Sequence, residues 1–266
     1  MSRGMTLAKP REHLANEDAI LVAENCIAVS DGAGGCGVFA DEWSAYLLAN
    51  LPQDSPLTTY EELNEWIDQI WEPFYEAHEE KAKLGDAMLV QKYYKEGSFA
   101  TLAAAWKIDE KHCHWMSYGD SVVFHYSPKN KTLEHSFTQL ADFLEPPHLI
   151  NCKDPLAEEG FRSGVFELDE TSMVFAASDA LSHYILMCYE LAHCGDYYEE
   201  LIAERNSGTT NGQLLAVAEQ MPMDFDKVLK DLLASVESAE RFESHMLSLQ
   251  ENGVLDKDDY SLVVLG

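Results

Sequence analysis

Basic residues are scarce in this sequence. Its 266 residues include 18 Lys and Arg against 47 Asp and Glu, which gives a formal net charge of −29 at pH 7. A surface this negative repels phosphate backbones and anionic lipid, so we expect neither a nucleic-acid partner nor a membrane-surface partner. High net charge also keeps a protein in solution, and this effect requires no partner at all.

Long apolar runs, repeats and flexible linkers are also missing. No stretch approaches the ~20 apolar residues that a transmembrane helix needs, and residues 1–14 contain no apolar core of the secretory kind. The apolar fraction of 46% and the charged fraction of 24% are those of an ordinary globular protein. We therefore expect a single domain over residues 1–266, located in the cytoplasm.

The cysteines form no recognisable metal or disulfide motif. None of them belongs to a C-x-x-C pair, so a structural zinc site has little support. Scattered cysteines in a chain of this length are typical of reduced, mostly buried thiols in a cytosolic protein. The six residues are Cys26, Cys36, Cys113, Cys152, Cys188 and Cys194.

Short apolar runs bounded by turn residues predict the strands. They cluster in the sequence instead of alternating strictly with helices, which favours an α+β fold with antiparallel sheets. The stretch 139–164 has the weakest pattern and is predicted to be a long loop or flap. The predicted strands cover residues 19–22, 26–29, 99–108, 113–118, 122–126, 173–177 and 262–265.

Two stripes of apolar residues at helical spacing predict helices that face the core. The first stripe runs from Leu63 to Phe74, and Pro73 is expected to kink or end that helix. The second stripe covers residues 225–236, ahead of the last predicted strand. A further helix is expected through Trp43.

A glycine cluster after the second predicted strand allows a different interpretation. Gly32, Gly34 and Gly37 satisfy the G-x-G-x-x-G spacing of dinucleotide-binding folds. Asp31 would then stand beside a pyrophosphate, and the chain lacks the repeated βαβ pattern of such folds. No Gly-Lys-Ser/Thr follows the cluster, and no G-x-S-x-G motif indicates a serine hydrolase. A nucleotide-binding oxidoreductase is therefore an alternative that depends on the glycine spacing alone.

Acidic residues gather at the ends of predicted strands. One Asp at a strand end is commonplace, because turns favour Asp, but this chain has several such places. If the strands lie together, their ends bring like charges into one cleft, which a hard cation such as Mg²⁺ or Mn²⁺ would make tolerable. Imidazole and thiolate are absent from these positions, which argues against zinc. The residues are Glu17, Asp18, Asp31, Asp120, Asp179, Asp258 and Asp259.

Six short motifs carry a family resemblance. In chain order they are Asn16-Glu17-Asp18, Asp31-Gly32-Ala33-Gly34-Gly35, Gly97-Ser98-Phe99-Ala100, Gly119-Asp120-Ser121, Ser178-Asp179-Ala180 and Asp258-Asp259-Tyr260-Ser261. Together they resemble the motif series of the metal-dependent (type 2C) Ser/Thr protein phosphatases, over residues 16–261. The resemblance implies an α-β-β-α sandwich of two antiparallel β-sheets flanked by helices. It also implies a binuclear Mg²⁺ or Mn²⁺ centre in a cleft at one end of that sandwich.

The resemblance also implies a role for each matching position. Asp31 resembles the carboxylate that bridges both metals, and Gly32 resembles the backbone-carbonyl contributor beside it. Glu17 resembles a ligand of one metal, and Asp18 resembles its close neighbour behind the metal.

Asp179 and Asp258 resemble the ligands of the other metal. Asp120 resembles the residue associated with a third, weaker metal. The implied reaction is hydrolysis of phosphoserine or phosphothreonine by a metal-bridging hydroxide, without a phospho-enzyme intermediate. The implied partners are a phosphorylated protein substrate and the kinase that modifies it.

Several positions depart from the family pattern. The arginine that usually holds the substrate phosphate is matched by His13, and Arg11 nearby could take its place, so the candidate catalytic residues are Asp31, His13 and Arg11. The histidine that many members carry in the D-G-x-G-G motif is replaced by Ala33. These departures leave open a catalytically weak relative that binds metal or phosphoprotein in a regulatory role. Three other motif positions differ: Phe99, Val122 and Ala180.

Overall fold

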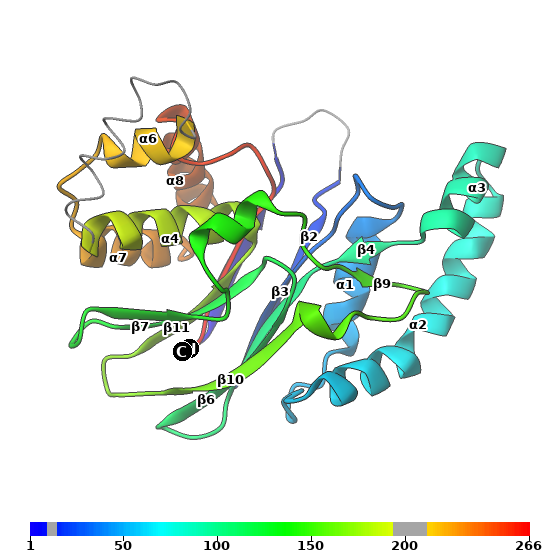
Figure 1. Cartoon of the computed structure of the whole chain (residues 1–266), viewed down its shortest axis with the longest axis horizontal. Helices are drawn as coiled ribbons and strands as arrows, with labels where there is room; N and C mark the ends of the chain where they lie inside the picture. Colours follow the sequence, from blue (N-terminus) through cyan, green and yellow to red (C-terminus); the bar gives the residue numbers. More distant parts are fainter. Residues whose placement is uncertain (10–14, 194–211) are drawn as a thin grey trace.

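Two antiparallel sheets of five strands each form the centre of the molecule (Figure 1). The computed structural model describes residues 1–9, 15–193 and 212–266. The first sheet has the order β1 (Arg3–Leu7), β12 (Tyr260–Val264), β11 (Met173–Ala177), β7 (Val122–Ser127) and β8 (Thr132–His135). The second has the order β10 (Phe161–Glu167), β6 (His112–Tyr118), β5 (Leu102–Lys107), β3 (Cys26–Asp31) and β2 (Asp18–Val22).

The two sheets pack face to face through small and branched apolar side chains. Alternate residues of β3 point to opposite faces, so Ile27 and Val29 enter the layer between the sheets while Cys26 and Ala28 face outward toward helices. Both faces of this strand are buried, which explains why its sequence is continuously apolar from Cys26 to Val29. The side chains between the sheets are Ile27, Val29, Ala103, Ala105, Cys113, Val123, Phe166, Val174, Ala176 and Val263.

Helices cover the outer face of each sheet, as Figure 1 shows. The second sheet packs against α1 (Ala40–Asn50), α2 (Tyr60–Lys83) and α3 (Ala87–Glu96). The first sheet packs against α4 (Asp179–His193), α6 (Gly212–Ala218), α7 (Phe225–Ser235) and α8 (Ala239–Glu251). The predicted α+β class and the α-β-β-α layering are therefore confirmed.

The predicted strand over residues 99–108 is divided in two. β4 (Phe99–Ala100) pairs with β9 (Ile150–Asn151), whereas β5 pairs with β3 and β6. Thr101 lies between the two parts, where its N–H donates to the carbonyl of Asp31 at 2.8 Å. The chain passes there from the two-stranded β4–β9 sheet to the second five-stranded sheet, so one apolar run forms two strands with different partners.

The stretch 139–164 is more ordered than the loop we expected. It contains η1 (Leu140–Leu144), β9 and η2 (Glu158–Gly160), and β10 begins at Phe161. The prediction was wrong for residues 161–164, which pair with β6. Half-exposed edge strands such as β10 carry little apolar signal of their own, because backbone pairing with a neighbour supplies much of their order.

Helix α2 continues ten residues beyond Pro73, to Lys83, and curves along its length (Figure 1). Of the two expected effects of Pro73, a kink or an end of the helix, the structure contradicts the end. A proline removes one helical hydrogen bond, but Phe74 beside it is 2% exposed and packs on Trp43 at 4.7 Å between ring centroids. This packing holds the helix against the core on both sides of the proline.

The cysteine interpretation is consistent with the structure. Among the described residues, Cys26, Cys113, Cys152 and Cys188 are free and buried, and Cys36 is free and exposed. Cys194 lies outside the described residues. Within the described part of the chain, no helix combines the length and the apolarity needed to cross a bilayer.

Candidate metal centre

The second sheet places two of the candidate carboxylates side by side. Asp18 begins β2, Asp31 ends β3, and the two residues are directly opposite each other in the antiparallel register. Side chains at opposite positions lie within ~4.5–5.5 Å at Cβ, and like charges there repel. Negative charge is therefore concentrated at this end of the paired strands β2 and β3.

The first sheet brings further carboxylates to the same end of the sandwich. β11 leads into Asp179 at the start of α4, and the pair Asp258-Asp259 precedes β12, the antiparallel neighbour of β11. Ser178 fastens the two strand ends, because its N–H donates to the carbonyl of Ser261 at 3.1 Å. The N–H of Ser261 donates in return to the Ser178 hydroxyl at 3.0 Å.

Asp120 joins the cluster from the turn between β6 and β7, where the chain passes from one sheet to the other. Gly119 before it has a φ of +99°, a conformation that favours glycine. A Cβ at this position would also lie 2.8 Å from Thr101 Cγ2. The glycine of this motif therefore shapes the turn that presents Asp120.

The carboxylates influence one another's protonation. Burial, and then the charges of Asp18, Asp179, Asp120 and Asp258, raise the pKa of Asp31 well above its usual range. Burial and the same kind of repulsion raise the pKa of Asp179. Burial is also the main reason why the pKa of Asp18 rises to about 7 and that of Asp120 to about 6. The cluster is thus a place where positive charge would be strongly favoured.

Asp18 is a buried member of the cluster whose carboxylate has no partner. It is 7% exposed, and neither carboxylate oxygen has a hydrogen-bond partner of normal geometry. The hydroxyls of Ser178 and Ser261 lie near enough to favour its charged form, but they do not offset the burial. A buried carboxylate in this condition is costly unless a cation compensates it.

Asp31 is oriented by its backbone contacts with Thr101. Its N–H donates to Thr101 Oγ1 at 3.2 Å, and Thr101 Oγ1 shares a hydrogen bond of 2.6 Å with Ser121 Oγ. The Ser30 hydroxyl donates to the Thr101 carbonyl at 2.7 Å. We did not predict Thr101, although its position directly after the fourth residue of the Gly97 motif could have indicated it.

Gly32 follows Asp31 against the start of α1. Its N–H donates to the carbonyl of Glu17 at 3.0 Å, and a Cβ at Gly32 would meet the Ala40 carbonyl at 2.6 Å. The Ser44 hydroxyl donates to the same Glu17 carbonyl at 2.6 Å. The glycine motif thus serves to bring β3, α1 and Glu17 together.

The Glu17 side chain lies against Gly34. A Cβ added at Gly34 would be 1.8 Å from Glu17 Oε1, whereas a Cβ at Gly35 would meet nothing within 4 Å. Neither glycine has a positive φ. The space at Gly34 is therefore reserved for a carboxylate oxygen.

We expect Gly34→Ala to weaken Mn²⁺ binding by about tenfold, because the new methyl group displaces the Glu17 carboxylate. Gly35→Ala makes the same chemical change in open space and should leave binding unchanged. Isothermal titration with Mn²⁺ measures both variants. Equal affinities for Gly34→Ala and Gly35→Ala would show that Glu17 is not a ligand.

Lys9 lies among the carboxylates, which we did not predict. Its Nζ is 3.2 Å from Glu17 Oε2, 3.1 Å from Asp258 Oδ1 and 3.7 Å from Asp259 Oδ2. Burial alone would lower the pKa of Lys9, but the hydrogen bond to Asp258 and the three negative charges raise it above its usual range. The basic candidates that we did predict, Arg11 and His13, lie outside the described residues.

The donor chemistry of the cluster fits a hard divalent cation. Every candidate ligand offers oxygen, as Mg²⁺ and Mn²⁺ prefer, and the unpartnered oxygens of Asp18 lack compensating charge. Among the described residues, no three or more Asp, Glu, His or Cys side chains are already arranged around one point as metal ligands. Side-chain rotations would therefore have to accompany metal binding.

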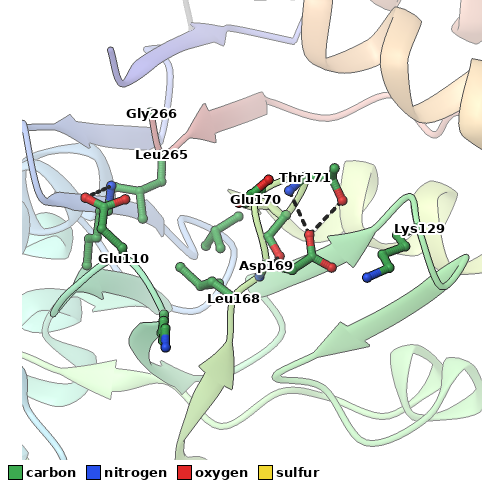
Figure 2. A pocket seen from close by; sticks show the side chains of 12 residues that line it. Glu110, Lys129, Leu168, Asp169, Glu170, Thr171, Leu265 and Gly266 are labelled. Carbon is green, nitrogen blue, oxygen red and sulfur yellow. Dashed lines mark hydrogen bonds and ion pairs between the residues drawn. The ribbon is translucent and has the colours of Figure 1, made fainter.

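A separate hollow of about 850 Å³ lies at the opposite end of the sandwich (Figure 2). Its lining includes Lys129, Asp169, Thr171 and Leu265, near the start of β11, whereas Asp179 follows the end of that strand. In Figure 2 the Asp169 carboxylate accepts hydrogen bonds from Thr171 within a tight turn. None of the carboxylates of the candidate metal centre lines this hollow.

A Ser-His-Glu chain also lies at this opposite end. His125 Nδ1 is 2.7 Å from Glu134 Oε2, and His125 Nε2 is 2.8 Å from Ser172 Oγ. The Ser172 hydroxyl accepts the N–H of Asp169 at 2.8 Å, and the N–H of Ser172 donates to the Asp169 carbonyl at 3.1 Å. Since the serine closes the turn before β11, we interpret this chain as structural.

Solved structures share this fold. Stp1, a serine/threonine phosphatase from Staphylococcus aureus, superposes with a TM-score of 0.57 at 15% identity, covering 99% of this chain and 93% of its own. The catalytic domain of the serine/threonine protein phosphatase PstP, solved with two manganese ions, gives 0.57 at 14% identity, covering 99% and 96%. PppA from Pseudomonas aeruginosa, a regulatory component of T6SS, gives 0.56 at 15%, covering 99% and 96%.

No protein-family model and no curated protein matches the sequence. At 14–15% identity, the likeness to these structures is a likeness of fold. The chain therefore has the fold of the bacterial serine/threonine phosphatases over nearly its whole length.

Proposed function

We propose that this chain is a metal-dependent phosphoprotein phosphatase that hydrolyses phosphoserine and phosphothreonine. The observation that carries the proposal is the carboxylate cluster at one end of a sandwich with a phosphatase fold. Burial and mutual repulsion raise the pKa of Asp31 and Asp179 there. Such strongly perturbed groups, gathered at one place, are typical of functional sites.

The ligands that we propose for two Mg²⁺ or Mn²⁺ ions are Glu17, Asp31, Asp179 and Asp258, with the Gly32 carbonyl. Asp18 would neutralise charge behind them, and Asp120 would serve a third ion. Two such ions would supply charge neutralisation and an activated water. The protein's own contribution is to hold its carboxylates at fixed positions, and phosphoryl transfer depends chiefly on positioning and charge.

A hollow of about 190 Å³ next to Asp120 is a candidate site for the phosphorylated side chain. His148 and Arg162 line it together with Gly119 and three carboxylates, Asp120, Asp142 and Glu145. The guanidinium of Arg162 lies 5.6 Å from the ring centroid of Phe137, which holds it at the wall of the hollow. A cation there suits the phosphate group of a substrate.

A regulatory module with weak turnover is the second candidate. It is favoured by the contacts of Lys9 with Glu17 and Asp258, which occupy two of the proposed ligands. Ala33, in place of the proton donor that many relatives carry, supports the same view. Such a module would bind metal or phosphoprotein and hydrolyse little or nothing.

The first measurement is hydrolysis of p-nitrophenyl phosphate and of a phosphothreonine peptide with Mn²⁺, with Mg²⁺ and with EDTA. We expect turnover with either metal and a loss of about a thousandfold or more in EDTA, because the carboxylates alone supply no positive charge at the phosphate. Turnover that survives EDTA would contradict the metal-dependent reaction. Metal binding without turnover would favour the regulatory module.

The partners that we propose are a phosphorylated protein and its kinase. The net charge of −29 favours substrates with basic residues around the phosphorylated site and disfavours nucleic acid and membranes. Free, mostly buried thiols suit a single domain that works in the cytoplasm.

A further inference from the structure

One ammonium group contacts carboxylates from both sheets. Lys9 Nζ is 3.2 Å from Glu17 Oε2, just before β2, and 3.1 Å from Asp258 Oδ1, two residues before β12. The Lys9 side chain is only 14% exposed, whereas the Asp258 side chain is 40% exposed. The lysine therefore points into the cluster instead of into solvent.

Backbone contacts hold Lys9 in this position. Its N–H donates to Asp259 Oδ1 at 2.6 Å, and the other oxygen of the same carboxylate accepts the N–H of Glu17 at 2.8 Å. Asp259 is 3% exposed. One buried carboxylate thus fixes the main chains of Lys9 and Glu17 beside each other. Lys9 is therefore held both at its backbone and at its ammonium group.

The contacts of Lys9 are selective. They reach Glu17, Asp258 and Asp259, and no ion pair joins Lys9 to Asp31 or Asp179 among the described residues. An ammonium is a compact positive charge with three donors and no acceptor, so it binds the same carboxylate oxygens that a metal ion would use. Both cations cannot hold the same oxygens together.

We propose that Lys9 is a tethered cation that competes with a divalent metal for Glu17 and Asp258. This inference builds on the proposed function, because it assigns a regulator to the same centre. A metal ion that takes both carboxylates has to displace the ammonium first. Lys9 thereby lowers the affinity of the centre for metal and raises the metal concentration that is needed to load it.

The test is a calorimetric titration with Mn²⁺ of the full chain and of two variants that each lose one positive charge. Lys9→Met should bind Mn²⁺ about tenfold more tightly than the wild type, because two charge-assisted hydrogen bonds no longer have to be broken. Lys129→Met is the matched control, since Lys129 is exposed in the turn between β7 and β8 (Figure 2). Its affinity should equal that of the wild type.

Thermal melting gives a second readout, which a merely structural lysine would not produce. With EDTA, Lys9→Met should melt below the wild type, because its carboxylates lose their counter-charge. With Mn²⁺, it should show the larger rise in melting temperature. Lys9→Gln is the milder variant to use if Lys9→Met does not fold.

Equal or weaker Mn²⁺ binding by the Lys9 variants would overturn the inference, and so would an absence of binding in every variant. Its failure is distinguishable from that of the proposed phosphatase. A wild type that binds Mn²⁺ but hydrolyses no phosphopeptide would refute the phosphatase, and the affinity comparison would still decide the role of Lys9.

Discussion

Asp31→Asn should abolish metal-dependent hydrolysis and, when metal is chelated, produce a more stable protein. The substitution removes a carboxylate that we propose as a metal ligand, so turnover should fall by about a thousandfold or more. It also removes a buried charge whose pKa is raised by burial and by Asp18, Asp179, Asp120 and Asp258. A neutral amide of the same shape relieves that repulsion, which is why stability should rise.

Phosphopeptide hydrolysis with Mn²⁺ and thermal melting in EDTA measure the two effects. Asp68→Asn is the matched control, since Asp68 is exposed on α2 and the same charge is lost there. The control should keep its activity and its melting temperature. Full turnover by Asp31→Asn, or a lower melting temperature in EDTA, would refute the role that we assign to Asp31.

In EDTA, the wild type should become more stable as the pH falls from about 8 to about 5. Burial raises the pKa of Asp18 from 3.8 to about 7 and that of Asp120 from 3.8 to about 6. Between pH 4 and 7 the folded state therefore holds more protons than the unfolded state, so the free energy of unfolding decreases as the pH rises. For Asp18, the shift corresponds to about 4 kcal/mol.

Asp18→Asn isolates this contribution. The variant should melt about 5 °C or more above the wild type at pH 8 in EDTA, and the difference should shrink as the pH falls and vanish near pH 4. Below pH 4 the opposite behaviour sets in, because hydrogen bonds from Thr171 and Ser127 hold the pKa of Asp169 at about 2 and favour its charged form. A wild type whose stability rises steadily from pH 5 to pH 8 would contradict the buried, repelling carboxylates.

The central strands were predictable because both of their faces are buried. β3 and β7 each begin with a run of three or four apolar residues, and a short apolar run bounded by turn residues indicates a buried strand. Of the four edge strands in the two five-stranded sheets, β2 was predicted from its apolar residues 19–22, whereas β1, β8 and β10 were not. Edge strands expose one side and carry polar residues, as in the Thr-Leu-Glu-His sequence of β8, so their order depends on a partner that is distant in the chain.

Helix α4 was missed for a related reason. Its buried residues run from Ala180 to Leu191 and include five consecutive positions from Tyr184 to Cys188. A helix buried on most of its circumference shows no stripe, and the helical pattern that identifies α2 and α7 is lost. Burial on all sides makes a strand recognisable as an apolar run, but it removes the apolar stripe by which a helix is recognised.

The acidic part of the site was predictable, and its basic part was not. Asp31 and Asp179 lie directly at strand ends, where a local pattern indicates them. The contact between Lys9 and Asp258 joins residues 249 positions apart, and no local pattern encodes it. Asp18 was expected beside Glu17 as a neighbour, but the depth of its burial depends on the packing of both sheets.

The pairing of β1 with β12 places the earliest and the latest parts of the chain next to each other, from Arg3 opposite Val264 to Leu7 opposite Tyr260. Proteins are synthesised from the N-terminus, so β1 has no partner until β12 has left the ribosome. Asp258 and Asp259 emerge at the same late moment, and Lys9 and Glu17 depend on them. A nascent chain can therefore assemble its second sheet early, but it cannot complete its acidic centre before residue 264 is in place.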